Sequence, residues 1–144
     1  MDVSNNSVMN VKQSDFRTAL QDSLFNEIAS RNDCKLYYTN TFGTIWIKDE
    51  EPTTEFRYVI IANQLIVSRI LFKNRRRGCM TACFEILKQF ASKLNYDTIV
   101  IQSVETYEMM QWCTKMDFMP SSCNIMVSDH FGRDVLIGDY YYHL

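Results

Sequence analysis

The middle of the chain places two apolar, strand-like runs on either side of one amphipathic helix, and this order constrains the fold more than any other feature. Residues 65–72 (LIVSRILF) and 98–104 (TIVIQSV) are rich in the β-branched residues that favour strands. Between them, apolar residues recur at helical spacing from Met80 to Leu94, which predicts a helix with one buried face. Two neighbouring strands joined through a helix run parallel, so we expect a parallel pair inside a mixed sheet.

The segments around this unit predict antiparallel strands and two further helices. Residues 56–62 (FRYVIIA) are separated from 65–72 only by Asn63 and Gln64, which indicates an antiparallel pair with a tight turn. The other expected elements are a flexible start (1–6), a short strand (7–12), a helix (14–31), β structure with a turn at Gly43 (34–51), a helix (105–116) and a closing β-hairpin with its turn at 129–134 (117–144). The expected class is therefore α+β, a mixed α/β arrangement around a central sheet.

Length, charge and the N-terminal sequence exclude several classes of protein. A chain of 144 residues that is 47% apolar is long enough for one core, so residues 1–144 are expected to form a single domain. The formal net charge of −2 argues against a nonspecific nucleic-acid binder. The polar N-terminus has no signal-peptide pattern, and no segment approaches the roughly 20 apolar residues of a membrane span. We therefore expect a cytoplasmic protein with no membrane partner.

The cysteines predict neither a metal site nor a disulfide framework. There are five of them, an odd number, they form no CxxC pair, and only two histidines accompany them. We expect free thiols in a reducing compartment and no bound metal. The cysteines are Cys34, Cys79, Cys83, Cys113 and Cys123.

Three arginines and a glycine stand directly between the strand 65–72 and the helix that follows. The first N–H groups of a helix have no intrahelical acceptor, and the helix dipole favours an anion there. Gly78 permits a close approach of the backbone, while Arg75 and its two arginine neighbours suit bidentate contact with phosphate. Taken alone, three arginines on a loop also fit a solvated surface. The sequence contains neither GxxxxGK[ST] nor GxGxxG, so a P-loop and a Rossmann dinucleotide site are not supported.

Two segments of the chain resemble the GCN5-related N-acetyltransferase (GNAT) superfamily. Arg75-x-x-Gly78-x-Met80 resembles the acyl-coenzyme A signature Arg/Gln-x-x-Gly-x-Gly/Ala, and it departs from that signature at Met80. About thirty residues later, TYEMMQWCTKMDFMP is similar to the segment N-x-x-A-x-x-F-Y-E-K-L-G-F of many members, with Trp112 at the first aromatic position and Phe118 at the last. The two matches cover about residues 64 to 120, and the rest of the chain agrees in its order of elements.

The resemblance implies a GNAT-like central mixed sheet with a splayed parallel pair flanked by helices, and acetyl-coenzyme A as co-substrate. It implies that the pyrophosphate lies on the loop and first helical turn and that the pantetheine arm lies along the end of the preceding strand. The residues expected to bind coenzyme A are Ile70, Leu71, Phe72, Arg75, Arg76, Arg77, Gly78, Cys79, Met80 and Thr81. The implied reaction is the transfer of an acetyl group to a primary amine of a small molecule, a protein or an aminoacyl-tRNA. Aminoacyl-tRNA is the one nucleic-acid partner expected, and exposed strand edges would permit a homodimer.

Two positions, Met80 and Cys113, leave catalysis open, and Met80 does so because it adds bulk near the place where the phosphates would approach. Many members of the superfamily carry, in the second helix, a tyrosine that protonates the leaving thiolate, and this chain has Cys113 there. A thiol can donate a proton to a thiolate of similar pKa, but a cysteine is also a common small core residue. No general base stands out among the acidic residues and histidines, which are Asp49, Glu50, Glu51, Glu55, Glu105, Glu108, His130 and His143. The alternative function is therefore a catalytically degenerate GNAT-fold protein that binds a ligand or a protein.

Overall fold

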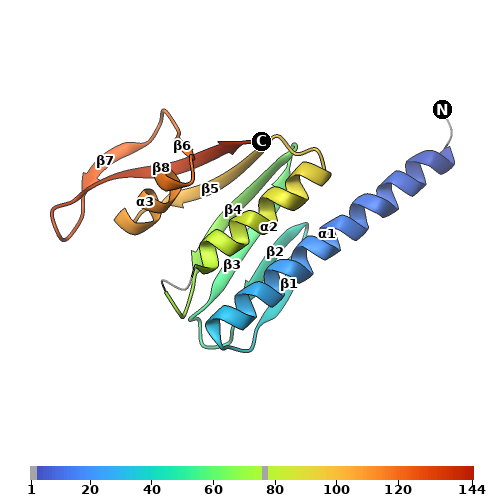
Figure 1. Ribbon diagram of the computed structural model, residues 1–144, viewed down its shortest axis with the longest axis horizontal. Coiled ribbons are helices and arrows are strands. Elements are labelled where there is room, and N and C mark those ends of the chain that lie inside the picture. Colours follow the sequence, from blue (N-terminus) through green and yellow to red (C-terminus); the bar gives the residue numbers. More distant parts are fainter. Residues whose placement is uncertain (1–2, 76–77) are drawn as a thin grey trace.

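The computed structural model describes residues 3–75 and 78–144, and within its first helix it describes side chains from residue 14 onward. This part of the chain forms three helices and one eight-stranded sheet (Figure 1). In chain order the elements are α1 (Val3–Asn32), β1 (Tyr37–Thr41), β2 (Thr44–Lys48), β3 (Glu55–Ile61), β4 (Gln64–Leu71), α2 (Cys79–Lys93), β5 (Thr98–Val104), α3 (Tyr107–Lys115), β6 (Met119–Pro120), β7 (Ile125–Ser128) and β8 (Asp134–His143).

The sheet is mixed, as the sequence predicted. Its strands lie in the order β1-β2-β3-β4-β5-β8-β6, and β7 pairs with β8 as a hairpin. All neighbouring strands are antiparallel except β4 and β5, which are parallel and are joined through α2. The predicted α+β class with a central parallel pair is therefore confirmed.

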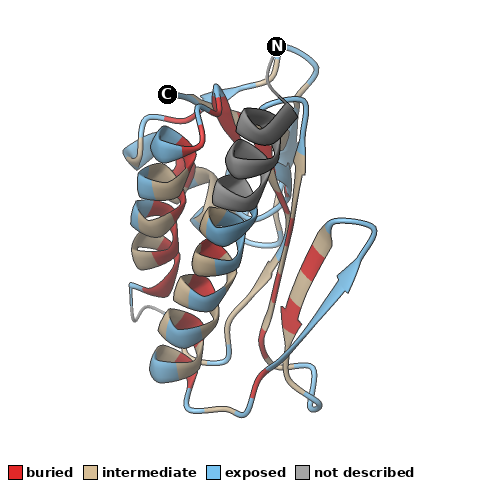
Figure 2. Ribbon diagram, turned by 90° about the vertical axis from the view of Figure 1, so that its right-hand side faces the viewer, coloured by how far each residue is buried: buried red, intermediate tan, exposed pale blue. Residues whose placement is uncertain are grey.

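Helices α1 and α2 lie side by side on one face of the sheet (Figure 1). Their buried residues face the strands, and their outer faces are exposed (Figure 2). Leu24 of α1 and Leu87 of α2 are completely buried, as are Phe56 and Leu65 of the sheet within rounding. Each such side chain stabilises the fold by about 1.5–3 kcal/mol relative to an exposed one. The apolar stripe predicted between Met80 and Leu94 is therefore the contact between α2 and the core.

Two local predictions were wrong. The strand expected over residues 7–12 is helical, because α1 begins at Val3 and runs on without a glycine or proline to break it. The same helix includes residues 3–6, and the expected flexibility of residues 1–6 stays a prediction. The tight turn between β3 and β4 lies at Ala62 and Asn63, one residue earlier than predicted, and both residues have positive φ angles (50° and 63°). That conformation matches the twist of the two strands.

Strands β4 and β5 pair along only part of their length. Four residue pairs join them, from Gln64 with Thr98 to Val67 with Ile101. Beyond this point Ser68 is an extra residue in β4, because Arg57 and Tyr58 of β3 pair with Arg69 and Val67. A bulge of this kind bends its strand and increases the twist. Beyond the four pairs, the C-terminal ends of β4 and β5 do not pair with each other, as the predicted splay requires.

The bulge also changes which residues of β4 face the helices. Leu65 and Val67 are buried beneath them, and without Ser68 the alternation would continue to Arg69. Instead Ile70 and Phe72 pack against the core, and the Phe72 ring stacks on Phe56 at a centroid distance of 6.4 Å. The extra residue therefore directs apolar side chains toward the point where the strands part.

None of the helices in the described part of the chain is both long and apolar enough to cross a membrane.

Candidate active site

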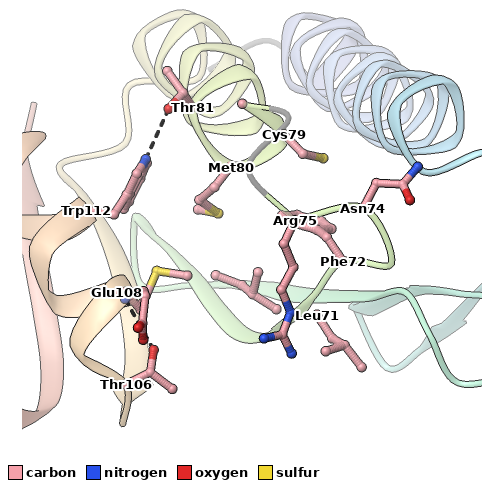
Figure 3. Close-up of a pocket in the computed structure, with 13 residues that line it drawn as sticks. Leu71, Phe72, Asn74, Arg75, Cys79, Met80, Thr81, Thr106, Glu108 and Trp112 are labelled. Atoms are coloured by element: carbon pink, nitrogen blue, oxygen red, sulfur yellow. Dashed lines mark hydrogen bonds between the residues drawn. The ribbon is translucent and has the colours of Figure 1, made fainter. Parts of the chain in front are cut away.

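A cavity of about 550 Å³ opens where β4 and β5 part, between the loop that precedes α2 and the start of α3 (Figure 3). Figure 3 shows Trp112 and Glu108 on one side of it and Phe72 and Arg75 on the other. The residues that line it are Ile70, Leu71, Phe72, Asn74, Arg75, Gly78, Cys79, Met80, Thr81, Thr106, Glu108, Met109 and Trp112. Its wall is thus apolar for the most part, with polar groups concentrated near the loop, as in many ligand sites.

The cavity collects the residues that the sequence predicted for coenzyme A. Eight of those residues lie in the described part of the chain, and all eight line the cavity. The other two, Arg76 and Arg77, lie outside the described residues. Placement in one cavity does not by itself identify a ligand, so the binding role of these residues stays a prediction.

The loop and the first turn of α2 form the polar end of the cavity. Gly78 caps the helix with a φ of 69°, a left-handed conformation that a residue with a Cβ adopts only with strain. The carbonyl of Gly78 accepts the first helical hydrogen bond, from Ala82 N at 3.0 Å. The N–H groups of Cys79, Met80 and Thr81 precede that bond and have no acceptor within the helix. This end therefore presents backbone donors to an anion, and the Arg75 side chain extends from the loop toward Leu71 (Figure 3).

Trp112 links the two walls of the cavity. Its indole Nε1 donates to Thr81 Oγ1 at 3.1 Å, and its ring meets Phe84 of α2 edge-on at a centroid distance of 5.6 Å. The motif match identified Trp112 as an aromatic position, but not as part of the cavity wall. Because Thr81 accepts this bond, its hydroxyl hydrogen remains available to a ligand oxygen.

Met80 and Cys79 are shared between the cavity and the core. The Met80 residue is 8% exposed, and in Figure 3 its side chain extends toward the cavity. Cys79 is 3% exposed, and its Sγ accepts from Asn32 Nδ2 of α1 at 3.6 Å. A hydrogen bond from Cys83 lowers the pKa of Cys79, with a further contribution from Asn32, although burial opposes them. Met80 therefore occupies cavity wall where the superfamily signature has a small residue.

Cys113, the predicted acid, is completely buried and is not among the residues that line the cavity. Burial raises the pKa of its thiol to about 12. A thiol in such surroundings is a poor proton donor to a thiolate of ordinary pKa. The core alternative is therefore favoured, and a catalytic role for Cys113 stays a prediction.

Of the acidic candidates for a general base, Glu108 is the one that lines the cavity. Glu108 lies in the first turn of α3, and its Oε1 pairs with Nη2 of Arg133, in the β7–β8 hairpin, at 3.2 Å. A hydrogen bond from its own backbone N–H, together with the Arg133 charge, lowers the pKa of Glu108. The carboxylate is thus ionised at neutral pH and complements the helix dipole.

The other base candidates lie away from the cavity. Asp49 holds the turn between β2 and β3, because its Oδ1 accepts from Thr53 N at 2.9 Å and from Thr54 N at 3.1 Å. Glu55 pairs with Arg69 at 2.9 Å. The remaining candidates, Glu50, Glu51, Glu105, His130 and His143, are likewise absent from the lining. Within residues 3–75 and 78–144, no three side chains of His, Cys, Asp or Glu lie close enough to hold a metal ion.

Sequence reasoning missed Asn74, Thr106 and Met109 as cavity residues. Thr106 is the N-cap of α3, and its Oγ1 accepts from Met109 N at 3.2 Å. A threonine directly before a helical apolar pattern is a capping signal, so the position of Thr106 could have been read from the sequence. No local signal identifies Asn74, because its partners lie about forty residues away.

Comparisons with known proteins identify the fold. No protein-family model matches the chain, and no curated protein matches it in sequence. A Bacillus subtilis acetyltransferase solved in complex with CoA superposes with a TM-score of 0.50 at 13% identity, over 71% of this chain and 78% of that one. A protein from Agrobacterium tumefaciens assigned to the acetyltransferases superposes with the same score at 12% identity, over 89% of this chain and 90% of that one. The chain therefore has the fold of the GNAT acetyltransferases.

Proposed function

We propose that this protein binds an acyl-coenzyme A in the described cavity and transfers its acyl group to a primary amine. The observation that carries the proposal is the placement of all eight described candidate residues around one cavity at the splayed ends of β4 and β5. The likeness to an acetyltransferase in complex with CoA supports the choice of ligand. Acetyl-coenzyme A is the co-substrate that we expect.

The chemistry of the cavity suits the two halves of such a ligand. Phosphates would meet the N–H groups at the start of α2 and the guanidinium of Arg75, both of which favour negative charge. An amide-containing arm would lie along Ile70 to Phe72, where backbone groups of β4 have no partner on β5. Acyl-coenzyme A supplies a thioester whose carbonyl carbon is open to attack by an amine, and coenzyme A leaves as the thiolate. Backbone N–H groups of β4 near this point would stabilise the charge that develops on the carbonyl oxygen.

A second candidate function is ligand binding without transfer. It is favoured by the burial of Cys113, and no tyrosine occurs among the described residues that line the cavity. The departing thiolate would then have no tyrosine hydroxyl close to it among the described lining residues. Water could supply this proton, so the two functions differ in their rates of turnover and not in their sites.

Calorimetry with acetyl-coenzyme A tests the shared ligand. We expect saturable binding. If acetyl-coenzyme A at about 1 mM gives no heat of binding, both the proposed transferase function and the proposed coenzyme A site are refuted. Gly78→Trp should abolish binding because the new side chain is strained at φ 69° and fills the loop. Gly43→Trp is the matched control, since Gly43 has a φ of 85° in the turn between β1 and β2 and its Cβ would meet nothing within 4 Å. Binding that survives Gly78→Trp would show that the ligand occupies another place.

Thiol release in the presence of candidate acceptors separates the two functions. The panel contains a polyamine, peptides with free N-termini and an aminoacyl-tRNA, because the cavity does not specify the amine. Release that depends on an acceptor supports transfer, whereas binding without release supports the degenerate alternative. We place the activity in the cytoplasm, where acyl-coenzyme A meets reduced thiols. We also propose that the exposed edge strands permit a homodimer, which light scattering of the purified chain would detect.

A further inference from the structure

Asn32, the last residue of α1, is a polar side chain with no exposed surface. Burying an amide costs free energy unless its donors and acceptor are satisfied. Its Oδ1 accepts from the backbone N of Asn74 at 3.0 Å. Its Nδ2 donates to the carbonyl of Ile28 at 2.8 Å and to Cys79 Sγ at 3.6 Å. One side chain from α1 therefore contacts both ends of the loop that joins β4 to α2.

Asn74 completes the connection from the loop side. Its Nδ2 donates to the carbonyl of Arg31 at 3.0 Å and lies 3.4 Å from Asp33 Oδ2. The carbonyl of Arg31 is one of the last four of α1, which have no partner within the helix. Asn32 thus accepts one hydrogen bond from the backbone of Asn74, and the Asn74 side chain donates to the end of α1. We call Asn32 and Asn74 the asparagine clasp.

The asparagine clasp contacts the loop at the end of the cavity where the hydrogen-bond donors for an anion lie. Asn74 and Cys79 line the cavity at the two ends of the loop, and Arg75 and Gly78 line it between them. Neither α1 nor Asn32 belongs to that lining. The backbone N–H of Lys73 is held separately by Thr54 Oγ1, at 3.2 Å. Asn32 is therefore placed to hold Asn74 and Cys79, on either side of the described loop residues Arg75 and Gly78, while it lies outside the cavity lining.

We propose that Asn32, from α1, is a positioning residue that holds Asn74 and the start of α2 in the arrangement that receives the phosphates of the ligand. The effect on the ligand rests on the proposed function, whereas the effect on the loop does not. Anion binding by backbone N–H groups depends on their alignment, so a loosened loop would weaken the ligand's phosphate contacts and spare its apolar ones.

Hydrogen exchange without ligand tests the effect on the loop. In Asn32→Ala the amide of Asn74 loses its acceptor, and we expect its exchange to accelerate by about tenfold or more while the β5 amides stay protected. Asn32→Asp keeps an oxygen in the accepting position and should restore protection of Asn74. Leu20→Ala is the control, because it weakens the packing of the same helix at a completely buried residue of its apolar face. Equal exchange at Asn74 in Asn32→Ala and the wild type would overturn the proposal.

Binding tests the consequence for the ligand. We expect Asn32→Ala to weaken acetyl-coenzyme A binding by about tenfold, and Leu20→Ala to leave it unchanged at a temperature where both are folded. The full chain with Asn32→Leu, which fills the same space without polar atoms, gives the same test if the alanine variant does not fold. Accelerated exchange with unchanged affinity would overturn the positioning role. If the wild type binds no coenzyme A, the proposed function fails, and the exchange of Asn74 still decides whether Asn32 positions the loop.

Discussion

The indole of Trp112 donates to the hydroxyl of Thr81 at 3.1 Å and so joins the start of α2 to α3 across the top of the cavity. This bond fixes the separation of the two helices at the place where the phosphates and the arm of a ligand would meet. The Trp112 ring also contacts Phe84 and Phe118, each at a centroid distance of 5.6 Å. One residue therefore combines a packing role with a polar contact in the cavity wall.

Trp112→Phe separates those two roles. Phenylalanine keeps an aromatic ring against Phe84 but removes the donor to Thr81, a bond worth about 0.5–1.5 kcal/mol. We expect a loss of that order in unfolding free energy, measured by denaturant titration, and weaker acetyl-coenzyme A binding by about two- to tenfold. The control is Thr81→Ser, which retains the accepting oxygen. Unchanged binding in Trp112→Phe would show that the spacing of α2 and α3 does not depend on this bond.

Cys113 is expected to behave as a core residue. Cys113→Ala should leave thiol release unchanged and destabilise the fold by about 1 kcal/mol, because it removes one buried atom and leaves a small cavity. Cys113→Ser places a hydroxyl in the same site and should cost about 1–3 kcal/mol, since the oxygen is desolvated. Denaturant unfolding gives both values. Turnover that falls in Cys113→Ala while binding persists would restore the acid role.

The sequence predicted the order of the elements and the residues of the loop side of the cavity, because both depend on local patterns. Periodicity identified α2 and β5, and the glycine and arginines marked the loop. No local pattern predicted the bulge at Ser68, since one extra residue in an apolar run leaves its composition typical of a strand. The asparagine clasp could not be predicted either, because Asn32 and Asn74 are 42 residues apart and come into contact only in the folded chain. Tertiary contacts, and not propensity, decide those features.

At the start of α1 a local pattern gave a wrong prediction. Val8 and Val11 lie in a short polar segment whose composition did not distinguish a strand from a helix, and the expected element there was a strand. In the structure the helix continues past the end of the sheet (Figure 1). Periodicity over about six residues cannot separate the two states, and the absence of a helix breaker was the more informative signal.

The ion pairs of Arg133 predict a pH-dependent contribution to stability. Arg133 bonds Asp129 at 2.7 Å and Glu108 at 3.2 Å, and it links the β7–β8 hairpin to α3. The pKa of Asp129 is lowered from 3.8, since hydrogen bonds from Arg133 and Phe131 outweigh burial, and that of Glu108 is lowered from 4.5. A carboxyl whose pKa is lower in the folded state stabilises the fold fully above its unfolded pKa and loses this contribution as pH falls through the folded value.

We therefore expect the difference in Tm between the wild type and Arg133→Gln to be constant near neutral pH. It should shrink as the pH falls through and below the range from 4.5 to 3.8. High salt should reduce the difference at neutral pH, because the groups are close to solvent. Lys88→Gln, which removes an exposed pair with Glu85 on α2, is the control. A Tm difference that stays constant into acid would show that Arg133 acts through its contact with the Tyr107 ring, whose centroid lies 4.3 Å from its guanidinium carbon, and not through the carboxylates.

Gly138 of β8 lies opposite the end of β5, in a backbone conformation that favours glycine. It pairs with Val104 just past the bulge of β5, and its φ is 138°. A Cβ at Gly138 would lie 1.9 Å from Asn124 Oδ1, while Asn124 Nδ2 donates to the carbonyl of Asp139 at 3.0 Å. Adding a methyl group must therefore displace the Asn124 side chain and break that bond.

Gly138→Ala is expected to destabilise the fold by about 1–3 kcal/mol, from the lost hydrogen bond and from the backbone strain of a residue with a Cβ. Asn124→Ala removes the obstructing side chain, so the double variant should be less destabilised than the sum of the two single variants. Denaturant unfolding of all four proteins measures this coupling. Because Asp139 Oδ1 also accepts from Ser103 N of β5 at 2.8 Å, Gly138→Ala should additionally accelerate hydrogen exchange at Ser103. Additive unfolding energies together with an unchanged amide at Ser103 would show that this part of β8 does not support the splayed end of β5.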